Sequence, residues 1–113
     1  MIKNGIYKIT TTMLDGVGIS NVHIMILHDG KLHGGGRYFY TVGSYSCSGS
    51  KWKGEATTQE HTPFHGKHPW ARKVVTLGFT GTYSNDDAEI DAVALVGKQR
   101  VRFKSILQLL AAD

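Results

Sequence analysis

Histidine is the residue type in this sequence that could most readily do chemistry, and three of the six histidines lie close together. His61, His65 and His68 follow the pattern H-x3-H-x2-H, and imidazole nitrogens are common ligands of zinc. Zinc needs three or four converging ligands, however, and residues 61–73 contain no cysteine or carboxylate. We therefore predict no metal site. The other three histidines recur every five residues, a spacing that a strand would turn to alternate faces: His23, His28 and His33.

Nucleophilic catalysis would depend on Cys47, the one cysteine of the chain. A reactive thiol needs an exposed, electropositive setting and a nearby base. Cys47 instead alternates with Tyr45 and Phe39 on an apolar face, where a thiol is a small hydrophobic group. A group of carboxylates flanks a predicted hairpin and indicates a solvated sheet edge: Asp86, Asp87, Glu89 and Asp91. We predict no catalytic residue and a protein that is not an enzyme.

Three consecutive glycines, Gly34 to Gly36, suggest a phosphate-binding loop at first sight. Such a loop needs a helix directly after the glycines, because the helix amides hold the phosphate. Here the glycines precede Arg37-Tyr38-Phe39-Tyr40, whose aromatic residues favour a strand. We therefore expect a barrel corner or a β-bulge, with positive φ angles at these glycines.

Composition and charge narrow the function classes further. The 113 residues fit one domain, and the net charge of +4 is spread without any block of five like charges. Lys51 and Lys53 would face away from Trp52 on one strand, so they make no stacking platform for nucleic acid. The N-terminus lacks a signal-peptide core and no apolar stretch is long enough to cross a bilayer. We expect a cytoplasmic protein without cofactors that contacts neither DNA nor membrane.

Alternation of apolar and polar residues dominates the chain. Tyr7 and Ile9 alternate with Lys8 and Thr10, and Asp29-Gly30 is a strong signal for a two-residue hairpin turn. The same period of two recurs in residues 38–47, 74–83 and 100–104. These patterns predict an all-β fold over residues 1–113, an antiparallel meander barrel of about eight strands whose last strand runs through Leu109. The one long connection, about 61–73, is expected to be a flexible loop.

Several short motifs occur in an order that resembles a known family. They are Lys3-Asn4-Gly5-Ile6-Tyr7, then residues 28–35 (HDGKLHGG), 38–45 (YFYTVGSY), 60–63 (EHTP) and 101–103 (VRF). Together they resemble the GrlR-type negative regulators of type III secretion, which are small bacterial proteins. The resemblance spans nearly the whole chain.

The resemblance implies a lipocalin-like barrel that is paired as a homodimer. It also implies a regulator of transcription that acts indirectly, by binding and sequestering a transcriptional activator. In the family an acidic surface stretch contributes to that contact. The aligned segment here, Ser46 to Lys51, contains no carboxylate.

A surface for self-association or for another protein is predicted on residues 22–27. Val22 and Ile24 would share one face of a strand, and Met25 and Leu27 the other, so that both faces are largely apolar. A barrel has one dry face, and a strand that is apolar on both faces must be covered outside as well. A dimer or an apolar groove for a partner protein would supply that cover.

The barrel interior is the other candidate site. Aromatic residues on the predicted inward faces are Tyr7, Phe39, Phe79, Tyr83 and Phe103. A barrel of about eight strands is either filled by side chains or holds one small ligand, and the chain length favours filling. The leading hypothesis is therefore a non-enzymatic regulator that acts by protein–protein binding, and the alternative is a barrel that binds a small molecule.

Overall fold

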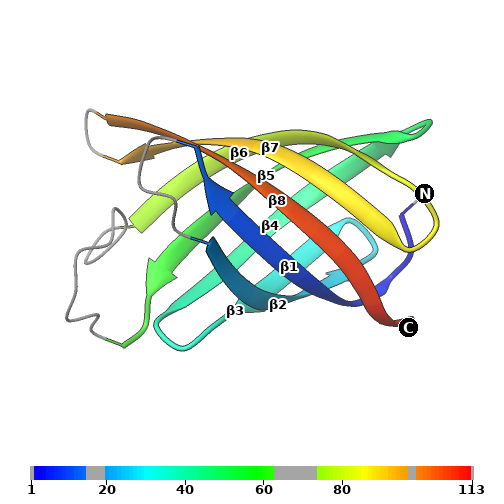
Figure 1. The fold of residues 1–113 in the computed structure, drawn as a ribbon, viewed down its shortest axis with the longest axis horizontal. Coiled ribbons are helices and arrows are strands. Elements are labelled where there is room, and N and C mark those ends of the chain that lie inside the picture. Colours follow the sequence, from blue (N-terminus) through cyan, green and yellow to red (C-terminus); the bar gives the residue numbers. More distant parts are fainter. Residues whose placement is uncertain (1, 15–19, 63–73, 97–98, 113) are drawn as a thin grey trace.

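A computed structural model describes residues 2–14, 20–62, 74–96 and 99–112 of the chain. The described residues form a closed barrel of eight strands in sequence order, each antiparallel to its neighbours (Figure 1). The strands are β1 (Gly5–Met13), β2 (Ser20–His28), β3 (Lys31–Gly35), β4 (Phe39–Ser48), β5 (Lys51–Glu60), β6 (Val74–Tyr83), β7 (Asp87–Val96) and β8 (Gln99–Ala112). The predicted all-β meander barrel is confirmed. The last strand continues past Leu109 to Ala112, because its final residues still pair with β1.

Period-two alternation decides which side chains fill the barrel. On β6, Val75, Leu77 and Phe79 are buried while Val74, Thr76 and Thr80 are exposed. On β8, Val101 and Phe103 are buried between exposed Arg100, Arg102 and Lys104, as the sequence pattern predicts. Because successive strand residues point to opposite faces, one set makes the core and the other meets water.

The hairpin between β2 and β3 shows how local sequence sets the strand order. Asp29 and Gly30 have φ angles of 46° and 84°, so both central residues of the turn lie in the left-handed region. That geometry is typical of the two-residue turns that match the twist of antiparallel strands. Asn4 holds the turn from outside, since its Nδ2 donates to Asp29 Oδ1 and its Oδ1 accepts from the Asp29 amide, both at 2.9 Å.

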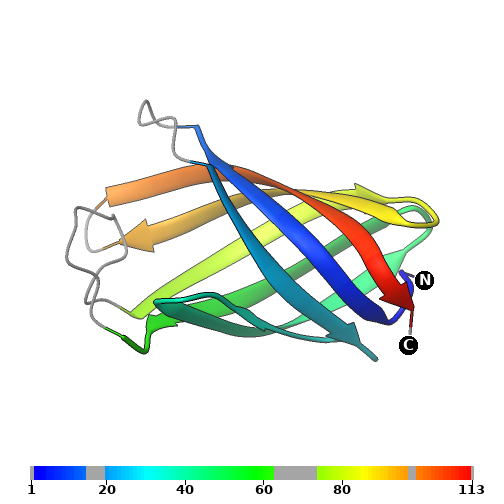
Figure 2. The ribbon, with the colours of Figure 1, turned by 60° about the horizontal axis from the view of Figure 1, so that its bottom comes forward.

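Closure of the barrel joins the beginning and the end of the chain. Gly5 of β1 lies opposite Ala112 of β8, and the pairing continues to Met13 and Phe103 with one irregularity between Ile6 and Tyr7. Figure 2 shows these two strands running side by side, in blue and red. The strand pair therefore removes the free sheet edges that an open meander would have.

Aromatic side chains close one end of the barrel, where the hairpin turns lie. The Tyr7 hydroxyl donates to Lys3 O at 2.7 Å, and the Trp52 indole donates to Glu89 O at 3.1 Å. Trp52 packs edge-on against Tyr45 and Phe79, with ring centroids 5.6 and 5.0 Å apart. Burial raises the pKa of the Tyr7 hydroxyl, and the nearby Tyr45 and Asp86 add to that effect. This end is a packed plug.

The three glycines take a different role from the one expected. They end β3 and lead into β4, and neither the β2–β3 nor the β3–β4 pairing shows a register shift there. None of the three has a positive φ. A Cβ at Gly34 would lie 2.7 Å from Met25 Sδ, and one at Gly36 would lie 2.6 Å from His23 Nδ1. Gly34 and Gly36 are required because Met25 and His23 of β2, together with the Ile24 carbonyl, occupy the space that their side chains would fill.

Candidate ligand-binding cavity

A cavity of about 400 Å³ lies inside the barrel. Trp52 forms part of its floor above the aromatic plug, and exposed Val22 and Arg37 lie at its mouth. Ligand pockets in proteins are commonly about 300–1,000 Å³ in volume. The expectation that side chains fill this interior is therefore wrong. Two of the lining positions carry small residues, Gly36 and Ala56. The absent side chain of Gly36 leaves room for the inward imidazole of His23.

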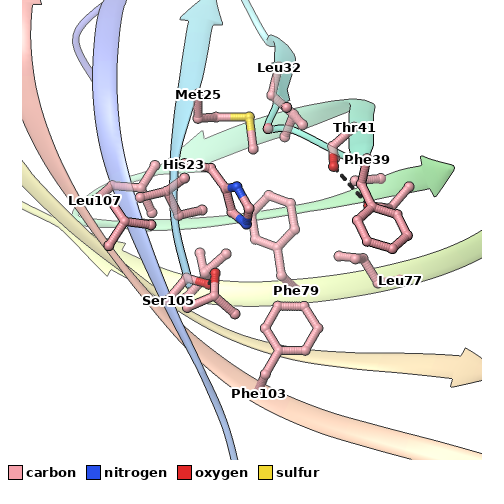
Figure 3. A pocket seen from close by; sticks show the side chains of 18 of the residues that line it. His23, Met25, Leu32, Phe39, Thr41, Leu77, Phe79, Phe103, Ser105 and Leu107 are labelled. Carbon is pink, nitrogen blue, oxygen red and sulfur yellow. Dashed lines mark hydrogen bonds between the residues drawn. The ribbon is translucent and has the colours of Figure 1, made fainter. Parts of the chain in front are cut away.

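Most of the cavity wall is apolar. Phe79 and Phe103 project into the space with Leu77, Leu107 and Met25, as Figure 3 shows. Leu107 is almost completely buried, and Phe79 and Phe103 are buried as well. Such a wall favours binding of an apolar molecule, because the contact removes apolar surface of both the wall and the molecule from water.

Two pairs of hydroxyl groups interrupt the apolar wall. Thr11 Oγ1 and Ser105 Oγ are 2.7 Å apart across the β1–β8 pairing, and both residues are buried. Thr41 Oγ1 and Thr58 Oγ1 are 2.8 Å apart across the β4–β5 pairing. Each pair satisfies part of its own hydrogen-bonding capacity, which lets hydroxyl groups sit inside an apolar barrel.

His23 also points into the cavity, from β2 (Figure 3). Its side chain is half-buried, and desolvation by burial lowers the pKa of its imidazole. The ring lies against Gly36, whose missing side chain leaves room for it. At neutral pH the imidazole is therefore uncharged, with one nitrogen that donates and one that accepts.

The segment between β3 and β4 forms one side of the mouth. The Arg37 guanidinium lies 5.4 Å from the centre of the Tyr38 ring, in the range of a cation–π contact. His61, at the end of β5, reaches the same segment through Nε2, 2.9 Å from Gly36 O. Nδ1 of the same ring lies 2.7 Å from Thr62 Oγ1. His61 thus ties the end of β5 to the glycine segment.

The five aromatic residues expected inside the barrel fall into two groups. Phe39, Phe79 and Phe103 line the cavity. Tyr7 is buried and Tyr83 is partly buried against the core, and both lie in the plugged half of the barrel. The Tyr83 hydroxyl donates to Gly49 O at 2.6 Å.

The expected outer surface on residues 22–27 is divided by the structure. Val22 and Ile24 are exposed, at 63% and 44% of their surface. Leu27 is 1% exposed and Met25 packs against the core, so these two residues line the cavity instead. Their assignment to a dimer or partner surface is wrong, because the alternation of β2 turns odd-numbered positions inward.

The other candidates for chemistry lie apart from the cavity. Cys47 is partly buried against the core, as expected for a small hydrophobic thiol. Asp86 is exposed and pairs with Lys3 at 2.9 Å, and Asp91 lies 3.9 Å from Lys104. His65 and His68 lie outside the described residues. Within the described ranges, no three histidine, cysteine or carboxylate side chains gather in the way that a metal ion requires.

Sequence reasoning missed the polar part of the cavity. Thr11, Thr41 and Thr58 occupy inward positions of their strands. Once the strands are paired, Thr41 lies opposite Thr58 and Thr11 opposite Ser105, so the strand register was the signal that could have predicted these hydroxyl pairs. His23 shares its face with Met25 and Leu27, so the same alternation that predicted an apolar face also placed an imidazole on it.

Comparison with known proteins adds no family assignment: no family model matches the chain, and no curated protein matches it. Among the described residues, no helix has both the length and the apolar character needed to span a membrane.

Proposed function

We propose that this protein is a non-enzymatic binding protein that holds a small apolar molecule inside its barrel. The observation that carries this proposal is the cavity of about 400 Å³ with its largely apolar wall. An eight-stranded barrel that needed only a core would fill this space with side chains. Here glycine and alanine line the cavity, and within the described part of the chain a packed plug closes the end with the hairpin turns.

The test is binding of an uncharged environment-sensitive dye, N-phenyl-1-naphthylamine, which is excited directly and brightens in apolar surroundings. The wild-type protein is expected to bind about one dye per chain. Leu77→Trp puts a larger side chain into the cavity and is expected to abolish binding. Val74→Trp is the matched control, because Val74 is exposed on the same strand. Equal binding by all three proteins, or no binding by wild type, would contradict the proposal.

The outer face of β1 to β4 supports a second candidate function, a regulator that acts by protein binding. Ile6 lies opposite Ile26, and Val42 and Tyr40 continue the exposed apolar face across β4. All four side chains are about 41–44% exposed. The resemblance to GrlR-type negative regulators of type III secretion favours a second copy of the chain as the occupant of this face. Sequestration of a transcriptional activator would then be the function of the dimer.

Light scattering tests this second candidate. The wild type is expected to have the mass of a dimer, and Ile24→Lys/Ile26→Lys the mass of a monomer with an unchanged circular dichroism spectrum. Thr76→Lys, on the exposed face of β6, is the control and keeps the wild-type mass. A monomeric wild type would rule out the dimer, and capture of an activator by the wild type but not by the double variant would support sequestration.

A further inference from the structure

The polar groups of the cavity are concentrated toward its open half. Thr11 lies near the end of β1, Thr58 near the end of β5 and Thr41 near the start of β4. These strand ends lie away from the plugged end, where the turns at 29–30, 49–50 and 84–86 are found (Figure 1). The deeper half is bounded by Trp52, Phe79 and other apolar side chains. Phe39, two positions before Thr41 on β4, and Phe103, two positions before Ser105 on β8, lie nearer the mouth than the hydroxyl pairs. The polar groups therefore form a band between the apolar floor and these two rings.

The two hydroxyl pairs lie on opposite walls. One pair joins β8 to β1 and the other joins β4 to β5, so that two strands separate the pairs in either direction around the closed barrel. In each pair one hydroxyl donates to the other, which leaves the second hydrogen free to donate. His23, on β2 between these seams, adds one donor and one acceptor. We call these five side chains, His23, Thr11, Ser105, Thr41 and Thr58, the polar belt.

The polar belt carries no charge at neutral pH. Of the described residues that line the cavity, Arg37 is the one with a permanent charge, and its side chain is exposed at the mouth. Partial burial lowers the pKa of the His23 imidazole from its ordinary value, which favours the neutral ring at this pH. A carboxylate or ammonium group drawn into such a cavity would lose its hydration without gaining an opposite charge. The walls therefore select against a charged group inside.

We propose that the ligand is an uncharged amphipathic molecule, with an apolar body against the aromatic floor and a carbonyl or similar hydrogen-bond acceptor at the polar belt. The inference rests on the proposed small-molecule binding and adds the chemical class of the ligand. A free hydroxyl hydrogen of one pair, or the His23 N–H, donates to the acceptor. Trp52 and Phe79 contact the body.

Three probes of one shape test the class: naphthalene, 2-acetylnaphthalene and 2-naphthoate at pH 7.5, each measured by displacement of N-phenyl-1-naphthylamine. The ketone is expected to bind at least about tenfold tighter than the carboxylate, a difference of about 1.4 kcal/mol. The ketone is also expected to bind more tightly than naphthalene, because the ketone, unlike naphthalene, offers an acceptor to the polar belt. A carboxylate that binds as tightly as the ketone would overturn the inference while leaving small-molecule binding intact.

A variant identifies the contact. Thr41→Val/Thr58→Val removes one hydroxyl pair at nearly constant volume and is expected to weaken the ketone toward the affinity of naphthalene while naphthalene itself is unaffected. Thr76→Val/Thr80→Val, on the exposed face of β6, is the control. An unchanged preference for the ketone both in this variant and in Thr11→Val/Ser105→Ala would show that the hydroxyl groups of the polar belt do not recognise the acceptor. Failure of every probe and of the dye would overturn the proposed function as well.

Discussion

Thr11 Oγ1 and Ser105 Oγ lie 2.7 Å apart inside the barrel, although 94 positions separate the two residues in the sequence. Each residue is buried, so the partner that each hydroxyl meets is fixed by the pairing of β1 with β8. This hydrogen bond therefore reports on barrel closure directly.

Removing both members of this pair is expected to destabilise the protein by less than the sum of the two single removals. Thr11→Val leaves the Ser105 hydroxyl buried without its partner, at a cost of about 1–3 kcal/mol. In Thr11→Val/Ser105→Ala no hydroxyl remains to be desolvated, so the double variant is expected to lose less than the sum of the single losses. Urea unfolding followed by circular dichroism measures the three free energies. Strict additivity would show that the two hydroxyl groups do not depend on each other.

The glycine segment offers a second prediction. A Cβ at position 36 would lie 2.6 Å from His23 Nδ1, so Gly36→Ala must push the imidazole aside. We expect a loss of about 1–3 kcal/mol in unfolding free energy and weaker dye binding. Gly36→Ala/His23→Ala should recover stability, because the clash is gone. Gly78→Ala is the control, since its Cβ would meet no described atom within 4 Å, and it should be neutral or gain up to about 1 kcal/mol.

The sequence predicted the barrel well because the patterns that indicate strands and turns lie within short stretches of the chain. The alternation of Val75, Leu77 and Phe79 with polar neighbours needs no knowledge of the rest of the fold. The Asp29-Gly30 turn likewise follows from two residues that tolerate positive φ, and the structure has that turn.

The interior could not be predicted in the same way. Whether inward residues fill a barrel depends on how side chains from strands far apart in sequence meet. Gly34 and Gly36 were interpreted as a barrel corner or a β-bulge rather than as positions that make room for Met25 and His23. The two apolar faces of β2 could be told apart only when the register was known. Val22 and Ile24 then proved to face outward, and Met25 and Leu27 inward.

His23 gives the stability of the fold a pH dependence with a definite sign. Burial lowers the pKa of its imidazole below the ordinary value of 6.5, so the unfolded chain binds the proton more readily. Stability rises with pH wherever the unfolded state holds more protons. The contribution of His23 is therefore a loss of stability as pH falls below about 6.5, which levels off once the folded protein is protonated as well.

Urea midpoints between pH 8 and pH 5 measure this contribution. The wild type is expected to lose more stability than His23→Gln on acidification, whereas His33→Gln, a change on the exposed face of β3, should follow the wild type. Arg37, Glu60 and His61 lie at the same end of the barrel and are present in all three proteins. Parallel curves for wild type and His23→Gln would exclude His23 as the source.

At Tyr45, removal of a buried hydroxyl is expected not to reduce stability. Its hydroxyl is buried and makes no hydrogen bond of good geometry with the residues that the structure describes, and the nearby Gly30 backbone only partly offsets the rise in its pKa that burial causes. Tyr45→Phe removes that unpaired group and keeps the edge-on contact with Trp52, so stability should be unchanged or higher. Tyr7→Phe is the comparison, because its hydroxyl donates to Lys3 O and its loss should cost about 0.5–1.5 kcal/mol. Thermal unfolding of both variants measures the difference, and a clear loss in Tyr45→Phe would show that its hydroxyl is bonded in solution.

The pairing of β1 with β8 also constrains how this chain can be made. Seven of the eight strand junctions join neighbours in sequence, but the eighth must wait for the final strand. A chain emerging from the ribosome would expose β1 and β7 as edge strands with unpaired backbone N–H and C=O groups until β8 was made. Binding of any molecule inside the barrel is thereby tied to the synthesis of β8.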